Sequence, residues 1–89
     1  NLKTYEKSFR ELNEMIGTIR DVSKDTGVRI IAVPPLTNML PTLARYSDTF
    51  SQHADAYKYG SHTGHMPIPA LKDMGIKGAM INHSEDRLD

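Results

Sequence analysis

The stretch Val28-Arg29-Ile30-Ile31-Ala32-Val33 decides the fold class of this chain. It is short, rich in β-branched residues and almost continuously apolar, which is the pattern of a strand covered on both faces in a parallel sheet. Pro34 and Pro35 follow at once and end the strand. A parallel sheet needs crossover connections, so helices are expected on both sides of this stretch.

A helix is predicted upstream of the strand. Its apolar residues recur every three or four positions, as they do on one stripe of a helix: Phe9, Leu12, Ile16, Ile19 and Val22. Ser8 is the expected N-cap, Glu11 completes a capping-box pattern, and Gly27 stands at the position after the C-terminus that favours glycine.

Downstream, the pattern predicts a continued alternation of helices and strands. The expected segments are a short or irregular helix over 36–43 with Pro41 in its first turn, a strand over 49–53, a loop over 55–65, a helix over 67–74 closed by Gly75, a strand over 78–81, and a helix start over 82–86. Alternation of this kind indicates βαβ units and therefore an α/β fold with a parallel sheet.

Composition excludes several classes of protein. The 89 residues carry 11 Lys and Arg against 11 Asp and Glu, which argues against a nucleic-acid partner because that binding needs clustered excess positive charge. No apolar run approaches the roughly 20 residues of a membrane span, and no export signal is visible. The absence of Cys excludes a disulfide framework and fits a reducing compartment, so a cytoplasmic location is expected.

Polar residues that follow strand-like runs are the first candidates for function, because sites in α/β folds lie at the carboxyl ends of parallel strands. Asn1 and Lys3 open the chain, and both would face one side of the sheet if a strand preceded them. Gln52-His53 ends the run over 49–53, and Asn82-His83 ends the run over 78–81.

His83 and Lys3 each allow a functional and a structural interpretation. A His at a helix N-terminus is kept neutral by the helix dipole, and a neutral imidazole can donate a hydrogen bond to a carbonyl oxygen and stabilise an enediolate-like charge. Alternatively, His83 caps or packs without doing chemistry. Lys3 can supply positive charge to a phosphate or oxyanion, or it is an exposed lysine.

Two further hypotheses concern the loop over 55–65. Its His62 and His65, with the two other histidines of the chain, permit a zinc site. The pair stands in a loop with Gly64 and lacks a carboxylate at a familiar spacing, so no metal is expected. Tyr57, Tyr59 and the neighbouring Met66 could instead anchor a protein partner.

Four motifs, in order, resemble the triosephosphate isomerase family, and specifically its archaeal branch. Asn1-Leu2-Lys3-Thr4-Tyr5 is similar to the Asn-x-Lys signature after the first barrel strand, and Gln52-His53 to the end of the third strand. Gly60-Ser61-His62-Thr63-Gly64-His65 resembles the third strand-to-helix loop, and Asn82-His83-Ser84-Glu85 the catalytic-histidine motif. The resemblance covers essentially all of the chain.

The resemblance implies a (β/α)₈ barrel that interconverts dihydroxyacetone phosphate and D-glyceraldehyde 3-phosphate in glycolysis and gluconeogenesis, without cofactor or metal. Lys3 would be the cation that holds the substrate, with Asn1 and Leu2 in the same pocket. His83 would be the electrophile. Glu85 would pair with the lysine, Ser84 would support it at the helix start, and Thr63 would reach across a subunit interface.

Three positions depart from the bacterial and eukaryotic pattern and indicate the archaeal form. Asn82, Asp86 and His65 stand where those sequences have Gly, Arg and Glu, respectively. The archaeal form is similar to compact barrels that assemble as tetramers, so the resemblance implies a homotetramer rather than a dimer.

The length sets a further expectation, because a barrel of this class typically needs about 250 residues. We expect residues 1–89 to be one partial barrel domain, incomplete at both ends, that runs from the end of strand 1 to the start of helix 4. The general-base glutamate, the lid and the phosphate loops would lie outside it, so the piece would be inactive alone. Two alternatives stay open, namely another phosphate-binding (β/α)₈ enzyme and a non-enzymatic interaction module that uses the 57–66 loop.

Overall fold

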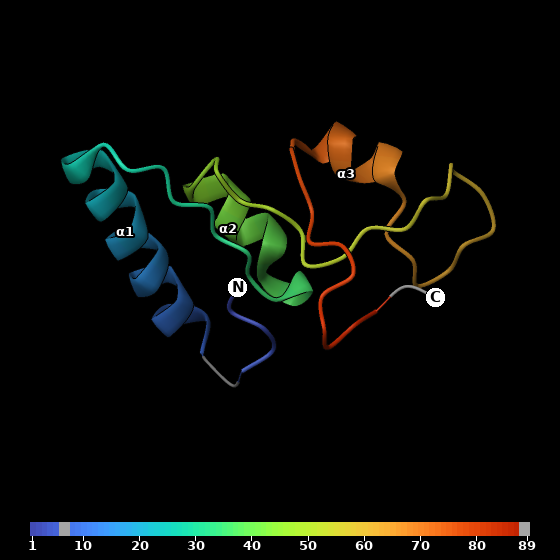
Figure 1. Ribbon diagram of the computed structural model, residues 1–89, viewed down its shortest axis with the longest axis horizontal. Helices are drawn as coiled ribbons and strands as arrows, with labels where there is room; N and C mark the ends of the chain where they lie inside the picture. The colour runs from blue at the N-terminus through green and yellow to red at the C-terminus, as the bar shows by residue number, and fades with distance from the viewer. Residues whose placement is uncertain (6–7, 88–89) are drawn as a thin grey trace.

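Three α-helices and the extended segments between them make up the described part of the chain, residues 1–5 and 8–87 of a computed structural model. Helix α1 spans Phe9–Thr26, α2 spans Met39–Arg45 after a single 3₁₀ turn over Leu36–Asn38, and α3 spans Ile68–Met74. Figure 1 shows α1 and α2 as neighbours on one side of an elongated body, with α3 toward the other end. No helix within the described ranges has both the length and the hydropathy needed to cross a bilayer.

The predicted caps of α1 are confirmed. The Ser8 hydroxyl accepts a hydrogen bond from the Glu11 backbone N–H at 3.1 Å and donates one to the Glu11 carboxylate. At the other end Gly27 has φ 71°, a left-handed conformation that costs glycine little, and its N–H bonds to the Ser23 carbonyl. Leu12 and Ile16, in the middle of the predicted stripe, are buried, whereas Phe9 and Val22 near its ends are exposed.

The two short helices also follow their sequence signals. Pro41 lies in the first turn of α2, where a missing backbone N–H costs nothing. Pro67 is the N-cap of α3 and Pro69 stands in its first turn. Gly75 ends α3 with φ 99° and donates its N–H to the carbonyls of the last turn.

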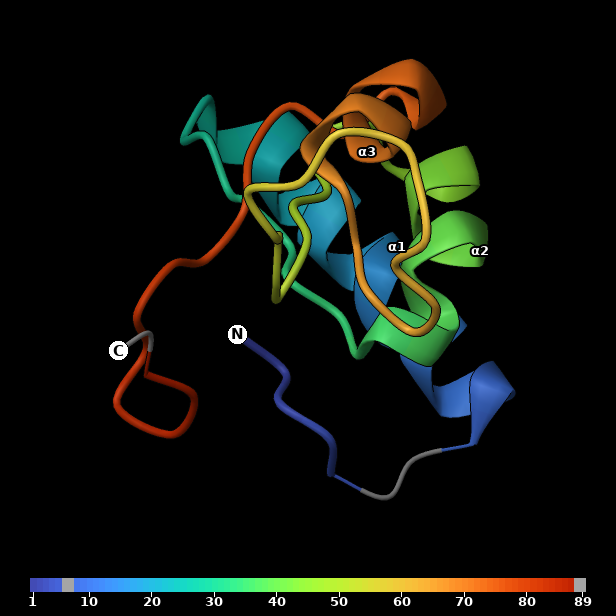
Figure 2. The ribbon, with the colours of Figure 1, turned by 90° about the vertical axis from the view of Figure 1, so that its right-hand side faces the viewer.

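The predicted strands are wrong as strands, although their pairing partners are those of a parallel sheet. Residues 28–33, 49–53 and 78–81 form isolated parallel bridges, Ala32 with Thr49 and Ser51 with Ala79, and no strand is present in the described part of the chain. Leu2 N–H also bonds to the Val33 carbonyl at 2.9 Å, which adds the N-terminal segment as a fourth neighbour. The four segments therefore lie side by side in chain order, as Figures 1 and 2 show.

Incomplete burial explains why these segments stop at bridges. A parallel strand is stable when both of its faces are covered, yet Val28 is 60% exposed and Ile81 is 67% exposed. The buried residues of the predicted strands lie at the bridges or next to them: Ala32 and Val33 in the first run, and Thr49 and Ser51 in the second. The pairing is therefore held at the few residues that packing protects.

The helix start predicted over 82–86 is also wrong. Asn82 has φ 59°, and the chain then folds into a turn in which the Asp86 N–H bonds to the His83 carbonyl at 2.8 Å. Asn tolerates the left-handed region better than most residues, which fits a position where the resembling bacterial and eukaryotic sequences have Gly. Residues 88–89, which follow the expected helix start, lie outside the described residues.

A hydrophobic cluster joins α2 to α3 and the residues that follow α3. Met39, Leu71 and Ile76 are its buried members. Half-buried apolar side chains surround them: Leu43, Ala54, Met66 and Met74. This cluster holds the segments over 49–54 and 76–80 next to each other, and those segments carry residues of the site described below.

Gly78 has no room for a side chain, because a Cβ atom there would lie 2.3 Å from the Phe50 ring. We expect Gly78→Ala to lower the free energy of unfolding of a full-length protein carrying this sequence by about 1–3 kcal/mol, the usual cost of overpacking. The matched control is Gly17→Ala in α1, where nothing lies within 4 Å of the added carbon. That helical substitution should stabilise by about 0.5–1 kcal/mol. Thermal denaturation compares the two, and a Gly78→Ala melting temperature at or above wild type would contradict the close approach.

Candidate active site

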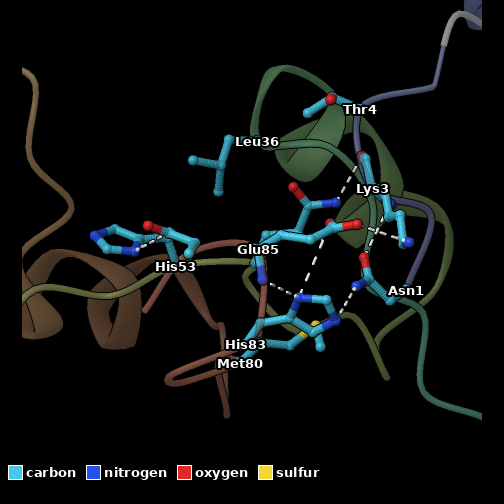
Figure 3. A pocket seen from close by; sticks show the side chains of 10 residues that line it. Asn1, Lys3, Thr4, Leu36, His53, Met80, His83 and Glu85 are labelled. Atoms are coloured by element: carbon cyan, nitrogen blue, oxygen red, sulfur yellow. Dashed lines mark hydrogen bonds and ion pairs between the residues drawn. The ribbon is translucent and has the colours of Figure 1, made fainter. Parts of the chain in front are cut away.

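A cavity of about 290 Å³ lies where the N-terminal residues 1–4, the end of the segment over 49–53 and the 83–86 turn meet. Figure 3 shows the side chains of Asn1, Lys3, His83 and Glu85 close together at this cavity. Polar and charged residues dominate the lining: Asn1, Lys3, Thr4, Leu36, Gln52, His53, Met80, His83, Glu85 and Asp86. Residues from the two ends of the chain thus share one site, as expected from the carboxyl ends of parallel strands.

Lys3 and Glu85 form an ion pair at this cavity. The Lys3 Nζ lies 2.8 Å from the Glu85 Oε1, and it also lies 5.8 Å from the centre of the Tyr5 ring. The hydrogen bond and the charge of Glu85 raise the pKa of Lys3 above its ordinary value. The same hydrogen bond and the charge of Lys3 lower the pKa of Glu85. Lys3 is therefore a fixed cation at the cavity wall.

The backbone of Lys3 is held in an unusual conformation. Its φ is 54°, a left-handed value that costs a lysine energy and persists only where neighbours enforce it. Asn1 Oδ1 accepts the Lys3 N–H at 2.8 Å, and Gln52 Nε2 donates to the Lys3 carbonyl at 2.7 Å. These two side chains therefore hold the Lys3 backbone at its N–H and at its carbonyl, which fixes the position from which its side chain extends.

His83 is placed as a neutral hydrogen-bond donor, although for a different reason than the sequence suggested. The predicted helix dipole has no helix behind it in residues 82–87. Instead the Glu85 backbone N–H donates to His83 Nδ1 at 3.2 Å, which requires a lone pair on Nδ1. The ring proton of the neutral form is then on Nε2.

The contact of Asn1 Nδ2 with His83 Nε2 is longer, at 3.5 Å. A neutral imidazole cannot accept hydrogen bonds at both nitrogens, so the shorter contact decides the tautomer. His83 therefore presents an Nε2–H group near Asn1 and the Lys3–Glu85 pair.

The other residues singled out from the sequence are distributed differently. Asn1, Lys3, His83 and Glu85 come together at the cavity. Leu2 and Ser84 are not among its lining residues, and Leu2 contributes its backbone to the pairing with Val33. Thr63 lies in an exposed turn of the 55–66 loop, also outside the cavity lining.

The loop over 55–66 is organised around two side chains. The Tyr57 ring stacks on His62 with centroids 4.2 Å apart, and it meets His65 edge-on at 5.2 Å. Asp55 accepts the Met66 backbone N–H at 2.8 Å, which closes the base of the loop. Among residues 1–5 and 8–87, no three His, Asp or Glu side chains gather in an arrangement that could hold a metal ion.

Gln52, His53 and Asp86 are site residues without a predicted role. Gln52 and His53 were signalled by their place after a strand-like run, and nothing in the pattern showed what they would contact. His53 lies with its Nε2 2.7 Å from Asp55 Oδ1 and its Nδ1 3.2 Å from Asp86 Oδ2. Asp86 lies close to His53 only because the 83–86 segment turns instead of continuing into a helix.

The Lys3–Glu85 pair should be lost in acid. The folded chain lowers the pKa of Glu85 below its ordinary value of 4.5, so its contribution to stability is present above that value and disappears as the pH falls through the folded pKa. We expect Glu85→Gln to lower the melting temperature of a full-length protein near neutral pH and to have no effect once the wild-type carboxyl is protonated. Melting curves of both proteins from pH 3 to 7 measure this, and a difference that persists in strong acid would contradict it.

Comparisons with known proteins point to one family. The family model described as triosephosphate isomerase matches residues 1–89. The chain is similar to the triosephosphate isomerases of three archaea: it is 41% identical to that of Sulfurisphaera tokodaii, 37% to that of Methanocaldococcus jannaschii and 36% to that of Methanoculleus marisnigri. Each match covers 99% of the chain and 39%, 41% and 40%, respectively, of the relative. The chain therefore spans about two fifths of the length of these curated relatives.

Proposed function

The chain belongs to the triosephosphate isomerase family, and from that membership we propose that a full-length protein carrying it interconverts dihydroxyacetone phosphate and D-glyceraldehyde 3-phosphate. The observation that carries the proposal is the convergence of Asn1, Lys3, His83 and Glu85 on one cavity. Family membership favours this reaction over that of another phosphate-binding barrel enzyme.

In the proposed reaction, His83 stabilises charge on the carbonyl oxygen, and Lys3 balances the negative charge of the phosphate and the oxyanion. The Nε2–H of a neutral His83 donates a hydrogen bond to the substrate carbonyl oxygen and stabilises the enediolate that forms when the adjacent carbon loses its proton. Triosephosphate isomerase is itself an established case of a neutral histidine in this role. Lys3 supplies the positive charge that balances the phosphate and the developing oxyanion.

Glu85 is a poor candidate for the base that moves the proton between C1 and C2. Its carboxylate is bound to Lys3 at 2.8 Å, and the lowered pKa makes it a weaker proton acceptor than a free carboxylate. We assign Glu85 to holding Lys3. The family resemblance implies that a different glutamate, outside residues 1–89, transfers the proton.

The finer features of the proposal follow from the same membership. The enzyme is a (β/α)₈ barrel, which the parallel bridges between Ala32 and Thr49 and between Ser51 and Ala79 support. It acts in the cytoplasm, in glycolysis and gluconeogenesis, and it assembles as a homotetramer. Thr63, exposed in the 55–66 loop, braces a neighbouring subunit.

The test of the proposed function is an isomerase assay on the purified full-length enzyme. Dihydroxyacetone phosphate should be converted to D-glyceraldehyde 3-phosphate, whereas the matched compound dihydroxyacetone, which lacks the phosphate, should react far more slowly. Inorganic phosphate should inhibit competitively. The absence of conversion in either direction by a folded protein would overturn the proposal.

A further inference from the structure

The His53 side chain lies between two carboxylates. Its Nε2 is 2.7 Å from Asp55 Oδ1, and its Nδ1 is 3.2 Å from Asp86 Oδ2. His53 is about one quarter exposed and Asp55 is 14% exposed, whereas Asp86 is largely exposed. The ring therefore bridges the segment over 49–55 and the turn that carries His83.

The protonation state of His53 decides whether this bridge holds. An imidazolium has an N–H on each nitrogen and attracts both carboxylates, whereas a neutral ring has one N–H and turns a lone pair toward the other carboxylate. The shorter Asp55 contact keeps the remaining proton in the neutral form. Loss of the second proton therefore converts the His53–Asp86 attraction into repulsion.

Asp86 is tied directly to the catalytic histidine. Its backbone N–H bonds to the His83 carbonyl at 2.8 Å, and the two residues form an antiparallel bridge across the turn. The same turn presents the Glu85 N–H to His83 Nδ1. A force on the Asp86 side chain is therefore transmitted to the backbone that orients the His83 ring.

We propose that His53 is a positioning residue of this site, an imidazolium clamp between Asp55 and Asp86 that holds the 83–86 turn in place and releases it when His53 loses its proton. The clamp rests on the proposed isomerase function, because it is the orientation of His83 that it controls. The clamp makes the geometry of the site depend on whether both nitrogens of the His53 ring carry a proton.

In the proposed clamp, His53 is the group whose charge changes, whereas its neighbours keep their charges or their partners. Asp55 stays ionised because the Met66 backbone N–H and the His53 ring lower the pKa of its carboxyl. His65 also faces Asp55, with its Nδ1 3.4 Å from the Oδ2 that His53 does not contact. Lys3, Glu85 and His83 line the same cavity but engage one another.

The test is a double-mutant cycle on the full-length enzyme, with His53→Gln, Asp86→Asn and the double variant, followed by kcat and KM from pH 5.5 to 9. Below the histidine transition each single variant should lower kcat roughly two- to fivefold, the range of a partly exposed ion pair, and the double variant should be no worse than either. Above the transition the difference from wild type should close. His65→Gln, which removes the other histidine on Asp55, should keep the wild-type pH profile.

Melting temperatures of the same proteins over the same pH range give a readout that does not need turnover. The stabilisation that couples His53 to Asp86 should be present at pH 5.5 and lost by pH 9. If the wild-type protein shows no isomerase activity, the function fails and the melting data decide the clamp by themselves. Additive single effects, or an effect of His53→Gln on kcat that does not change with pH, would overturn the clamp. Asp86→Asn alters an exposed side chain, so it tests the pair even if His53→Gln fails to fold.

Discussion

Lys3→Met should lower kcat/KM of a full-length enzyme carrying this sequence by about 10³-fold, with kcat falling and KM rising together. Removing a single oxyanion donor commonly costs about 10²–10³ in kcat, and Lys3 also holds the substrate phosphate in the proposed mechanism. The loss should exceed that of Glu85→Gln, because Glu85 acts through the lysine. Steady-state kinetics in both directions, with circular dichroism to confirm folding, measure the effect.

Lys24→Met is the matched control, because Lys24 is an exposed lysine in the last turn of α1 and does not line the cavity. Its kcat/KM should equal that of wild type. If Lys3→Met lost no more activity than Lys24→Met, Lys3 would be an ordinary surface lysine, which is the structural interpretation that its sequence position left open. An effect on KM alone would limit Lys3 to substrate binding.

The helices were predictable because their signals are local. Ser8 and Glu11 cap α1 within one turn, and Gly27 and Gly75 accept left-handed conformations that end α1 and α3. Each of these interactions involves residues a few positions apart, so the sequence pattern contains the whole interaction. The buried middle of the α1 stripe follows from the same periodicity.

The strands and the expected helix after His83 were not predictable in the same way. A run such as residues 28–33 becomes a strand only where other segments cover both faces, and in the described chain only its last residues are covered. The polar residues over 82–86 are compatible with the start of a helix and also with a turn. The left-handed Asn82 and the bond between Asp86 and His83 select the turn.

The sequence predicted which residues lie at the site better than it predicted their contacts. The alternation of strands placed Asn1, Lys3 and His83 at one edge, and the structure brings all three to one cavity. The contacts of His53 with Asp55 and Asp86 depend on where two segments meet in space, which no spacing rule contains. Asp86 is also a position where the family resemblance departs from the bacterial and eukaryotic pattern, so the resemblance supplied no role for it.

His83→Gln should reduce kcat of the full-length enzyme by about 10²–10³-fold while changing KM little. The Nε2–H of His83 is the donor proposed for the carbonyl oxygen, and that hydrogen bond strengthens only as negative charge develops in the transition state. Glutamine keeps a donor of similar length but lacks the fixed ring that the Glu85 N–H orients through Nδ1. Its loss should therefore fall on the chemical step.

The division between kcat and KM separates the electrophilic role from the alternative that His83 only packs or caps. A packing residue lowers the melting temperature and reduces the fraction of active enzyme, and kcat per active site stays near wild type. An electrophile leaves folding largely intact and slows each turnover. Active-site titration with a tight-binding phosphorylated inhibitor, combined with kcat, distinguishes the two. A His83→Gln enzyme with unchanged kcat per titrated site would remove His83 from the reaction, although its ring lies beside Asn1 at the cavity.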